Sequence, residues 1–302
     1  MTIHSRLSAG RLASVVAIAL TASNLAADVA PDEVIAPGNH SFVFESRGKT
    51  IPVFTYRPDG YDGGPLILVL HGMNRNASEY RDRAVAMGDR FNALIAAPEF
   101  DASQFPSEAY QRGGITRSGE VMPADQWTFR FFAEIIEDIR RREGRPDMPC
   151  HIVGHSAGGQ ILTRMAAFQP DGPIVRIIAA NPGSLVFPTR DLPFQYGFGG
   201  LPEELGGDVA IRRYLAAPLT LFLGTADTGT NNLDQSQTAM RQGPTRIARG
   251  RACFAAARDL ADSRGWEFNW RIVEAEGIGH NSGRLFAHEN AGLAIFGPRA
   301  DN

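Results

Sequence analysis

Three short runs of almost wholly apolar residues constrain the fold of this chain more than any other feature of its sequence. They are Leu66–Leu70, Ile174–Ala180 and Leu219–Leu223, and none shows the strict alternation of a strand with one solvent-facing side. Such runs suit strands that are covered on both faces, as in a parallel sheet. We therefore expect an α/β fold, in which helices flank a mostly parallel sheet.

Five other runs, rich in β-branched and aromatic residues, extend the expected sheet to eight strands. Two of them, Ser41–Glu45 and Ile51–Tyr56, are separated by a short turn sequence and predict a hairpin. The remaining three are Ala93–Ala97, His151–Val153 and Phe268–Val273. Helical patterns separate the later strands, which is the order typical of an α/β domain.

Two of the helical stretches carry clear boundary signals. Apolar residues recur at helical spacing over Trp127–Arg142, where Asp125 is a candidate N-terminal cap. The second stretch, Ile247–Arg264, ends at Gly265, a residue type that commonly terminates helices. We expect both to be helices that cover the sheet.

The first residues differ from the rest of the chain. Arg6 and Arg11 precede an apolar run, Leu12–Leu20, and small and polar residues follow it. This order is typical of a secretory signal peptide, and the run is shorter than the ~20 residues that span a bilayer. We expect a signal peptide over residues 1–27, cleaved near residues 23–30, and a single domain over 28–302.

The expected leader predicts that the protein is exported to the periplasm or the medium, with no stable membrane span. The alternative is a frayed N-terminal helix in a cytoplasmic protein. The formal net charge of −3 offers no broad cationic surface, so we expect no nucleic-acid partner. The two cysteines, Cys150 and Cys253, lack the spacing of a metal site; we favour two buried free thiols over a disulfide.

The strongest chemical signal is the pentapeptide Gly154-His155-Ser156-Ala157-Gly158. An apolar strand precedes it and a helix-like run follows, which is the context in which G-x-S-x-G lifts a serine hydroxyl out of a sheet. Glycines on both sides allow the backbone to bend without a Cβ clash. We expect Ser156 to be a nucleophile, next to helix N–H groups that favour negative charge.

A serine nucleophile needs a base and an orienting acid, which in this fold follow it in the order acid, then histidine. His280 lies in a glycine-rich loop after the last expected strand, whereas His288 falls in the next helical stretch, so we expect His280 to be the base. Asp227 directly follows the penultimate strand and is the expected acid, with Asp234 as the reserve.

Acyl transfer also needs two donors for the oxygen anion of the tetrahedral intermediate. One should be the backbone N–H of Ala157, directly after the nucleophile. The other should be that of Met73, in the loop after Leu66–Leu70, where Gly72 allows close approach of the backbone. We expect the neighbouring His71 to hold this loop by hydrogen bonding.

These segments carry a resemblance to a known family. The stretches LILVLHGMN, IVGHSAGGQIL, LFLGTAD and GIGHNSG together resemble the α/β-hydrolase superfamily, and within it are similar to poly(3-hydroxybutyrate) depolymerase catalytic domains and feruloyl esterases. The resemblance implies a serine esterase with the α/β-hydrolase fold, a triad of Ser156, Asp227 and His280, and no metal or organic cofactor. No linker or substrate-binding domain follows the matching segments, which favours a small or oligomeric ester over an insoluble polymer.

An aromatic insertion is expected between the sixth and seventh strands. The segment Leu185–Pro218 lies there and carries four aromatic residues among prolines and glycines: Phe187, Phe194, Tyr196 and Phe198. These side chains either line a pocket for an acyl or aryl group or anchor the loop to the body of the domain. A second irregular segment, Phe100–Pro123, is a candidate for the opposite wall of such a pocket.

The functional hypotheses differ in the bond that is cleaved and in the acceptor. The first is hydrolysis of a carboxylic ester through an acyl-enzyme. The second uses the same triad in an acyltransferase, a thioesterase or a peptidase. The third is a binding protein that keeps the fold without turnover, which the complete set of catalytic residue types disfavours.

Overall fold

The computed structural model describes residue 1, residues 33–169 and residues 171–298. Except for Met1, the expected signal peptide lies outside the described residues. Within them, no helix is both long and apolar enough to cross a membrane.

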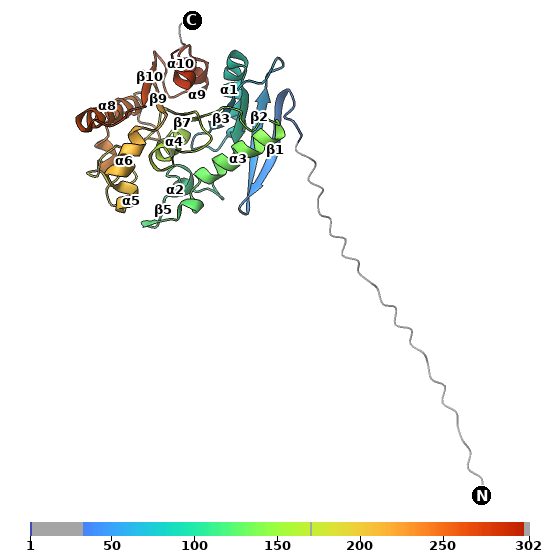
Figure 1. Cartoon of the computed structure of the whole chain (residues 1–302), viewed down its shortest axis with the longest axis horizontal. Coiled ribbons are helices and arrows are strands. Elements are labelled where there is room, and N and C mark those ends of the chain that lie inside the picture. Colours follow the sequence, from blue (N-terminus) through green and yellow to red (C-terminus); the bar gives the residue numbers. More distant parts are fainter. Residues whose placement is uncertain (2–32, 170, 299–302) are drawn as a thin grey trace. The chain divides into compact units, whose positions relative to one another are not determined.

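A single large sheet organises the domain (Figure 1). Its eight strands run in the order β1-β2-β4-β3-β7-β8-β9-β10. Their bounds are β1 Gly38–Ser46, β2 Lys49–Arg57, β3 Leu66–Leu70, β4 Leu94–Pro98, β7 Cys150–His155, β8 Arg176–Ala180, β9 Leu219–Gly224 and β10 Arg271–Ala275. The β1–β2 hairpin is antiparallel, as is the β2–β4 pair, and every later pairing is parallel. The expected mostly parallel, eight-stranded sheet is therefore confirmed.

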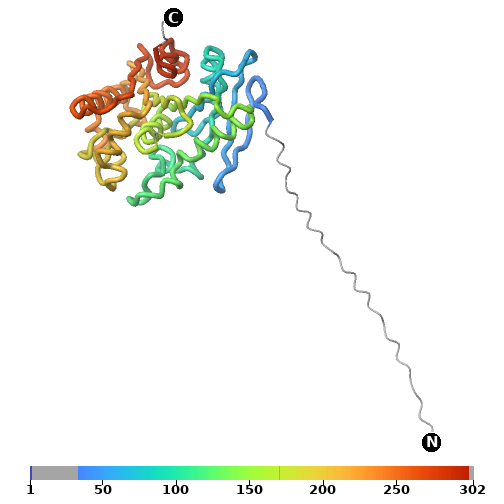
Figure 2. Tube along the Cα trace, viewed as in Figure 1, coloured from blue at the N-terminus to red at the C-terminus, as the bar shows by residue number. Residues whose placement is uncertain are grey.

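Helices cover both faces of this sheet and enclose two apolar cores. One face carries α1 Ala77–Phe91, α9 Ser282–Ala287 and α10 Ala291–Phe296; the other carries α3 Phe129–Arg142, α4 Ala157–Phe168, α6 Asp208–Leu215 and α8 Arg246–Arg264. In Figure 2 the red C-terminal helices lie beside the teal α1, far away in the sequence. Along β3, Leu66, Leu68 and Leu70 enter one core, while Ile67 and Val69 enter the other. This explains why the run is apolar throughout.

Short elements fill the connections. They are α2 Ser107–Tyr110, the two-stranded sheet of β5 Thr116–Arg117 and β6 Glu120–Val121, a 3₁₀ helix over Ala124–Gln126, α5 Glu203–Gly206 and α7 Gln237–Met240. The small sheet and α2 lie in the segment that the sequence left without a pattern.

Several predicted boundaries need correction, among them the following three. Asp125 does not cap α3, because it belongs to the 3₁₀ helix and the capping position is Thr128, whose hydroxyl instead donates to Ala109 O. β8 starts two residues later than expected, at Arg176. β10 starts at Arg271 because Trp270 donates its indole N–H to Tyr214 O and packs against that ring.

Other predicted local features are confirmed. Gly265 ends α8 in the left-handed conformation, with φ 63°. Cys150 and Cys253 are both buried and unpaired. Burial raises the pKa of the Cys150 thiol to about 12, so it remains protonated at neutral pH.

Candidate active site

Ser156 occupies the turn between the end of β7 and the start of α4. Its own backbone carries the unusual conformation, φ 59° and ψ −113°. Gly154 and Gly158 have no left-handed φ, but a Cβ on Gly154 would clash with the backbone of Gly158, and one on Gly158 with the backbone of Leu70. The glycines are therefore needed for close approach of the two chain segments, and the strained bend lies on the serine itself.

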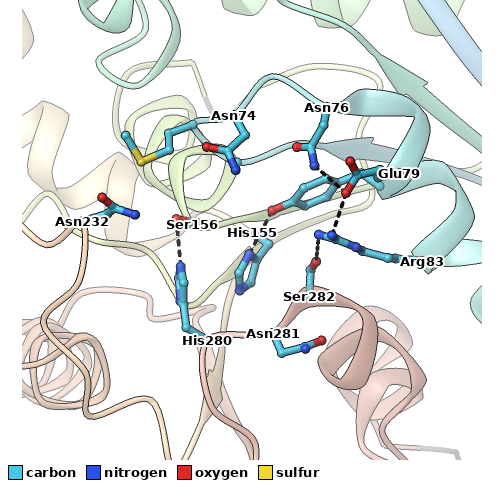
Figure 3. A pocket seen from close by; sticks show the side chains of 13 residues that line it. Asn74, Asn76, Glu79, Arg83, His155, Ser156, Asn232, His280, Asn281 and Ser282 are labelled. Carbon is cyan, nitrogen blue, oxygen red and sulfur yellow. Dashed lines mark hydrogen bonds and ion pairs between the residues drawn. The ribbon is translucent and has the colours of Figure 1, made fainter.

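The structure brings together the three side chains that were expected to form a triad. His280 Nε2 lies 3.0 Å from Ser156 Oγ, and His280 Nδ1 lies 2.7 Å from Asp227 Oδ2 (Figure 3 shows the first of these contacts). The Asp227 side chain is 1% exposed and that of His280 is 31% exposed. Because the ionised carboxylate only accepts hydrogen bonds, Nδ1 is the donor and Nε2 is free to accept the serine proton.

The reserve residues lie in other surroundings. Asp234 accepts a hydrogen bond from the hydroxyl of Tyr196. His288 is the C-terminal capping residue of α9, and its Nδ1 accepts from the Asn290 N–H. Neither makes a hydrogen bond to His280 or Ser156 within the described residues.

The two expected oxyanion donors lie beside this triad. Ala157 is the first residue of α4, and Met73 and Gly72 line the same pocket as Ser156. A Cβ built on Gly72 would lie 3.9 Å from Ser156 Cβ, which measures how closely the loop after β3 approaches the serine. Among the described residues, the N–H groups of Met73 and Ala157 donate no hydrogen bond, so both are available to a ligand.

His71 holds the loop that carries Met73, as the sequence predicted. Phe100 N–H donates to His71 Nε2 at 3.0 Å, so Nδ1 is the protonated nitrogen, and it donates to Gly72 O at 2.9 Å. Burial lowers the pKa of His71 to about 4, and the ring is neutral at physiological pH.

A cavity of about 360 Å³ opens over Ser156 and is lined mainly by polar groups (Figure 3). Its walls are Gly72, Met73, Asn74, Asn76, Glu79, Tyr80, Arg83, His155, Ser156, Asn232, His280, Asn281 and Ser282. Glu79 accepts hydrogen bonds from Asn76 and Arg83, and Arg83 also donates to Ser282 Oγ. These contacts fix the polar side chains on the α1 wall before any ligand binds.

Two residues of the site were missed by sequence reasoning. His155 packs against His280 with ring centroids 4.5 Å apart, and its Nδ1 lies 3.1 Å from the Tyr80 hydroxyl. Burial is the larger cause, and the nearby His280 the next, of a pKa of His155 well below its ordinary value. This second imidazole therefore stays neutral. Its place beside the serine in G-x-S-x-G was the signal that could have identified it.

The second missed residue is Arg246, which lies behind the acid. Its Nη1 is 3.6 Å from Asp227 Oδ1, and both side chains are almost fully buried. In the sequence it is one of several arginines in and around an alanine-rich helix, so no local pattern distinguishes it.

The aromatic insertion does not line this cavity. Phe194 and Phe198 pack on Phe168 of α4, and Tyr196 is 8% exposed. Phe187 packs against the same cores as these residues. The structure thus places the four aromatic side chains as anchors of their loop, the second of the two expected roles. The other proposed wall is also absent from the cavity lining, since Phe105 and Tyr110 are buried in the core.

Arg164 of α4, which is fully buried, helps to hold the insertion in this place. Its guanidinium donates to the backbone carbonyls of Ser184 and Gln195 and to the Ser184 hydroxyl. These bonds fasten the insertion to α4, the helix on which Phe194 and Phe198 pack.

Comparison with known proteins identified two solved structures that are about one third identical to this chain. A poly(aspartic acid) hydrolase-1 from Sphingomonas sp. KT-1 is 32% identical over 83% of this chain and 96% of that chain, with a TM-score of 0.77. The poly(3-hydroxybutyrate) depolymerase LpqC from Bordetella parapertussis is 33% identical over 91% of this chain and 97% of that chain, with a TM-score of 0.79.

More distant structures share the fold alone. The siderophore hydrolase EstB from Aspergillus nidulans is 15% identical over 89% of this chain and 99% of that chain, with a TM-score of 0.52. No protein-family model matches the sequence, and neither does any of the curated proteins compared with it.

Proposed function

This chain belongs to the α/β-hydrolase superfamily, and from that membership we propose that it is a serine hydrolase that cleaves a carboxylic ester. The expected fold is confirmed, and solved structures about one third identical to the chain are of a poly(aspartic acid) hydrolase and a poly(3-hydroxybutyrate) depolymerase, which supports a hydrolytic function. The observation that carries the proposal is the hydrogen-bonded series from Ser156 through His280 to Asp227.

In the proposed reaction, Ser156 Oγ attacks the ester carbonyl carbon while its proton passes to His280 Nε2. The N–H groups of Met73 and Ala157 donate to the oxygen anion of the tetrahedral intermediate. His280 then gives the proton to the leaving alcohol as the C–O bond breaks, which leaves an acyl-enzyme. Water attacks the acyl group while His280 takes its proton. His280 then returns a proton to Ser156 Oγ as the bond from Oγ to the acyl carbon breaks, and the acid is released.

The polar lining supports a substrate that forms hydrogen bonds close to the ester. Asn74, Asn76 and Asn232 surround the serine, whereas Met73 and Tyr80 are the larger apolar or aromatic side chains of the lining. A long alkyl chain would cover the amides of Asn74 and Asn232 without offering them a hydrogen bond, which is unfavourable. We propose a short hydroxy-acid ester or a soluble oligomer of one, with no nucleic-acid partner and no metal or organic cofactor.

A second candidate is hydrolysis of an amide in an acidic polymer. It is favoured by the poly(aspartic acid) hydrolase about one third identical to the chain, and by Arg83, the cationic side chain in the lining. Glu79 lies 2.8 Å from that arginine and offsets its charge, which is why the ester is the first candidate. The acyltransferase and thioesterase alternatives use the same residues and differ in acceptor or leaving group.

The test is labelling with a fluorophosphonate probe, which modifies activated serines. We expect the wild-type protein to be labelled and Ser156→Ala to lose the label along with at least ~10³-fold of its rate on p-nitrophenyl butyrate. Ser282→Ala is the matched control, since Ser282 lines the same cavity and should leave Ser156 labelled. Folded wild-type protein that takes no label would favour the binding-protein hypothesis.

Substrate comparison then separates the hydrolase candidates. Release of acid from soluble 3-hydroxybutyrate oligomers, compared with peptide-bond cleavage in aspartate oligomers, decides between ester and amide. Added alcohols reveal an acyltransferase if transfer products exceed hydrolysis products.

We also propose that the chain is exported after removal of a signal peptide. The charged, apolar and small-residue order of residues 1–27 supports this. Expression of the full chain in a Gram-negative host, followed by mass spectrometry of the periplasmic fraction, should find a mature N-terminus near residues 23–30. Intact protein retained in the cytoplasm would contradict export.

A further inference from the structure

Arg246 is the first residue of α8 and is buried against the proposed catalytic acid. Its Nη1 lies 3.6 Å from Asp227 Oδ1, with the two side chains only 2% and 1% exposed. Oδ1 accepts no hydrogen bond from any described residue, while the other oxygen, Oδ2, is bonded to His280. The carboxylate therefore lies between two groups: an imidazole on one oxygen and a permanent cation near the other.

The same guanidinium also holds the loop that presents Asp227. Nη1 donates to Gly229 O at 3.2 Å, and Nη2 donates to Asn231 O at 2.7 Å. Both carbonyls lie a few residues after Asp227, in the segment that follows β9. Arg246 can thus act in two ways: by fixing the position of the carboxylate and by placing a charge next to it.

We propose that Arg246 is a positioning residue whose charge keeps Asp227 ionised and opposes protonation of His280, so that His280 remains a base at lower pH than the Asp227–His280 pair alone would allow. This inference rests on the proposed serine-hydrolase function. A cation near one end of a buried carboxylate weakens the carboxylate's pull on a proton at the other end. Removing the cation leaves the negative charge of the carboxylate to be balanced by the imidazolium alone.

Other titratable and charged groups around His280 do not replace this effect. His155, from β7, packs against His280 with its ring tilted but is kept neutral by burial. Arg83, from α1, is paired with Glu79 and bonded to Ser282. Among the described residues, Arg246 is therefore the cation that directly faces the acid.

The test measures the rate of fluorophosphonate labelling of Ser156 as a function of pH, which requires no knowledge of the natural substrate. We expect Arg246→Met to move the midpoint of the acid limb upward by about 0.5–1 pH unit. Well below the midpoint, this lowers the labelling rate about 3–10-fold relative to wild type. Arg246→Lys keeps the charge and should keep the midpoint, with a lower plateau because lysine cannot reproduce both carbonyl contacts.

Arg249 provides a matched control on the same helix. It is also buried and donates to Gly243 O, Gly183 O and Asp234 O, but no hydrogen bond or ion pair joins it to Asp227 in the described part of the chain. Arg249→Met should therefore leave the midpoint where it is in the wild type.

The outcomes separate the two roles. An unmoved midpoint, or a downward shift, in folded Arg246→Met would show that Arg246 merely holds the loop, because a displaced carboxylate stabilises the imidazolium less. If circular dichroism shows that Arg246→Met does not fold, Arg246→Gln replaces it, because glutamine is neutral but can still donate to a carbonyl. The same upward shift of the midpoint is then expected for Arg246→Gln. Absence of labelling in the wild type would instead reject the proposed function.

Discussion

Ser156 holds a backbone conformation, φ 59° and ψ −113°, that residues with a Cβ seldom adopt. Such a residue costs of order 1–3 kcal/mol and persists only where the surroundings enforce it. Here the contacts of Gly154 and Gly158 with neighbouring backbone leave no room for the turn to relax. The same turn presents Oγ to His280, so the strain and the proposed reactivity share one cause.

This strain predicts an unusual order of stability for two inactive variants. Ser156→Gly should be more stable than Ser156→Ala by about 0.5–1 kcal/mol, because relief of the positive φ exceeds the extra conformational entropy of glycine in the unfolded chain. Urea unfolding of both variants measures the difference. The same pair of changes at Ser263, an exposed residue within α8, should give the opposite order, with alanine more stable. If the alanine variant is the more stable one at both positions, Ser156 is not strained.

At the scale of secondary-structure elements, the sequence predicted what local patterns determine. Apolar runs marked the strands, and the order serine, acid, histidine selected residues that follow β7, β9 and β10, whose ends meet at one edge of the sheet. Ser156, Asp227 and His280 follow those three strands. In the structure, His280 lies within hydrogen-bonding distance of both Ser156 and Asp227. Their placement was predictable since each follows a strand with a clear pattern.

Long-range contacts made by single side chains were not predictable. The composition of the aromatic insertion suits either a pocket wall or an anchor, and long-range bonds, such as those from Arg164 to Ser184 and Gln195, hold it in the second role. On α8 the arginines look alike in sequence, yet Arg246 and Arg249 are buried while Arg251 is exposed. Which of them faces the acid depends on how the helix packs, and a weak apolar periodicity cannot predict that.

Considered as a whole, the domain buries three histidines at the centre of its sheet. His71 directly follows β3, His151 is the second residue of β7, and His155 is its last. Burial lowers the pKa of His71 and of His151 to about 4, and that of His155 well below its ordinary value. The fold is therefore coupled to these rings being neutral, apart from any role that one of them has near Ser156.

This coupling predicts acid sensitivity with a definite sign. Between pH ~6.5 and ~4 the unfolded chain binds protons at these histidines and the folded protein does not, so the free energy of unfolding is intact above this window and falls as the pH decreases through it. Each histidine contributes about 1.4 kcal/mol per pH unit within the window. Urea titrations at a series of pH values measure the total slope.

His151 allows the contribution of one ring to be isolated, because it lies outside the cavity, where it packs against Phe296, and its Nδ1 has no hydrogen-bond partner among the described residues. His151→Gln should reduce the proton uptake on unfolding by about one between pH ~6 and ~4.5, whatever its effect on absolute stability, since glutamine does not titrate. His40→Gln, at an exposed position on β1, should leave the slope close to that of wild type. Parallel pH profiles for wild type and His151→Gln would mean that His151 accepts a proton without loss of the fold, and that burial at the sheet centre does not set the acid limit of stability.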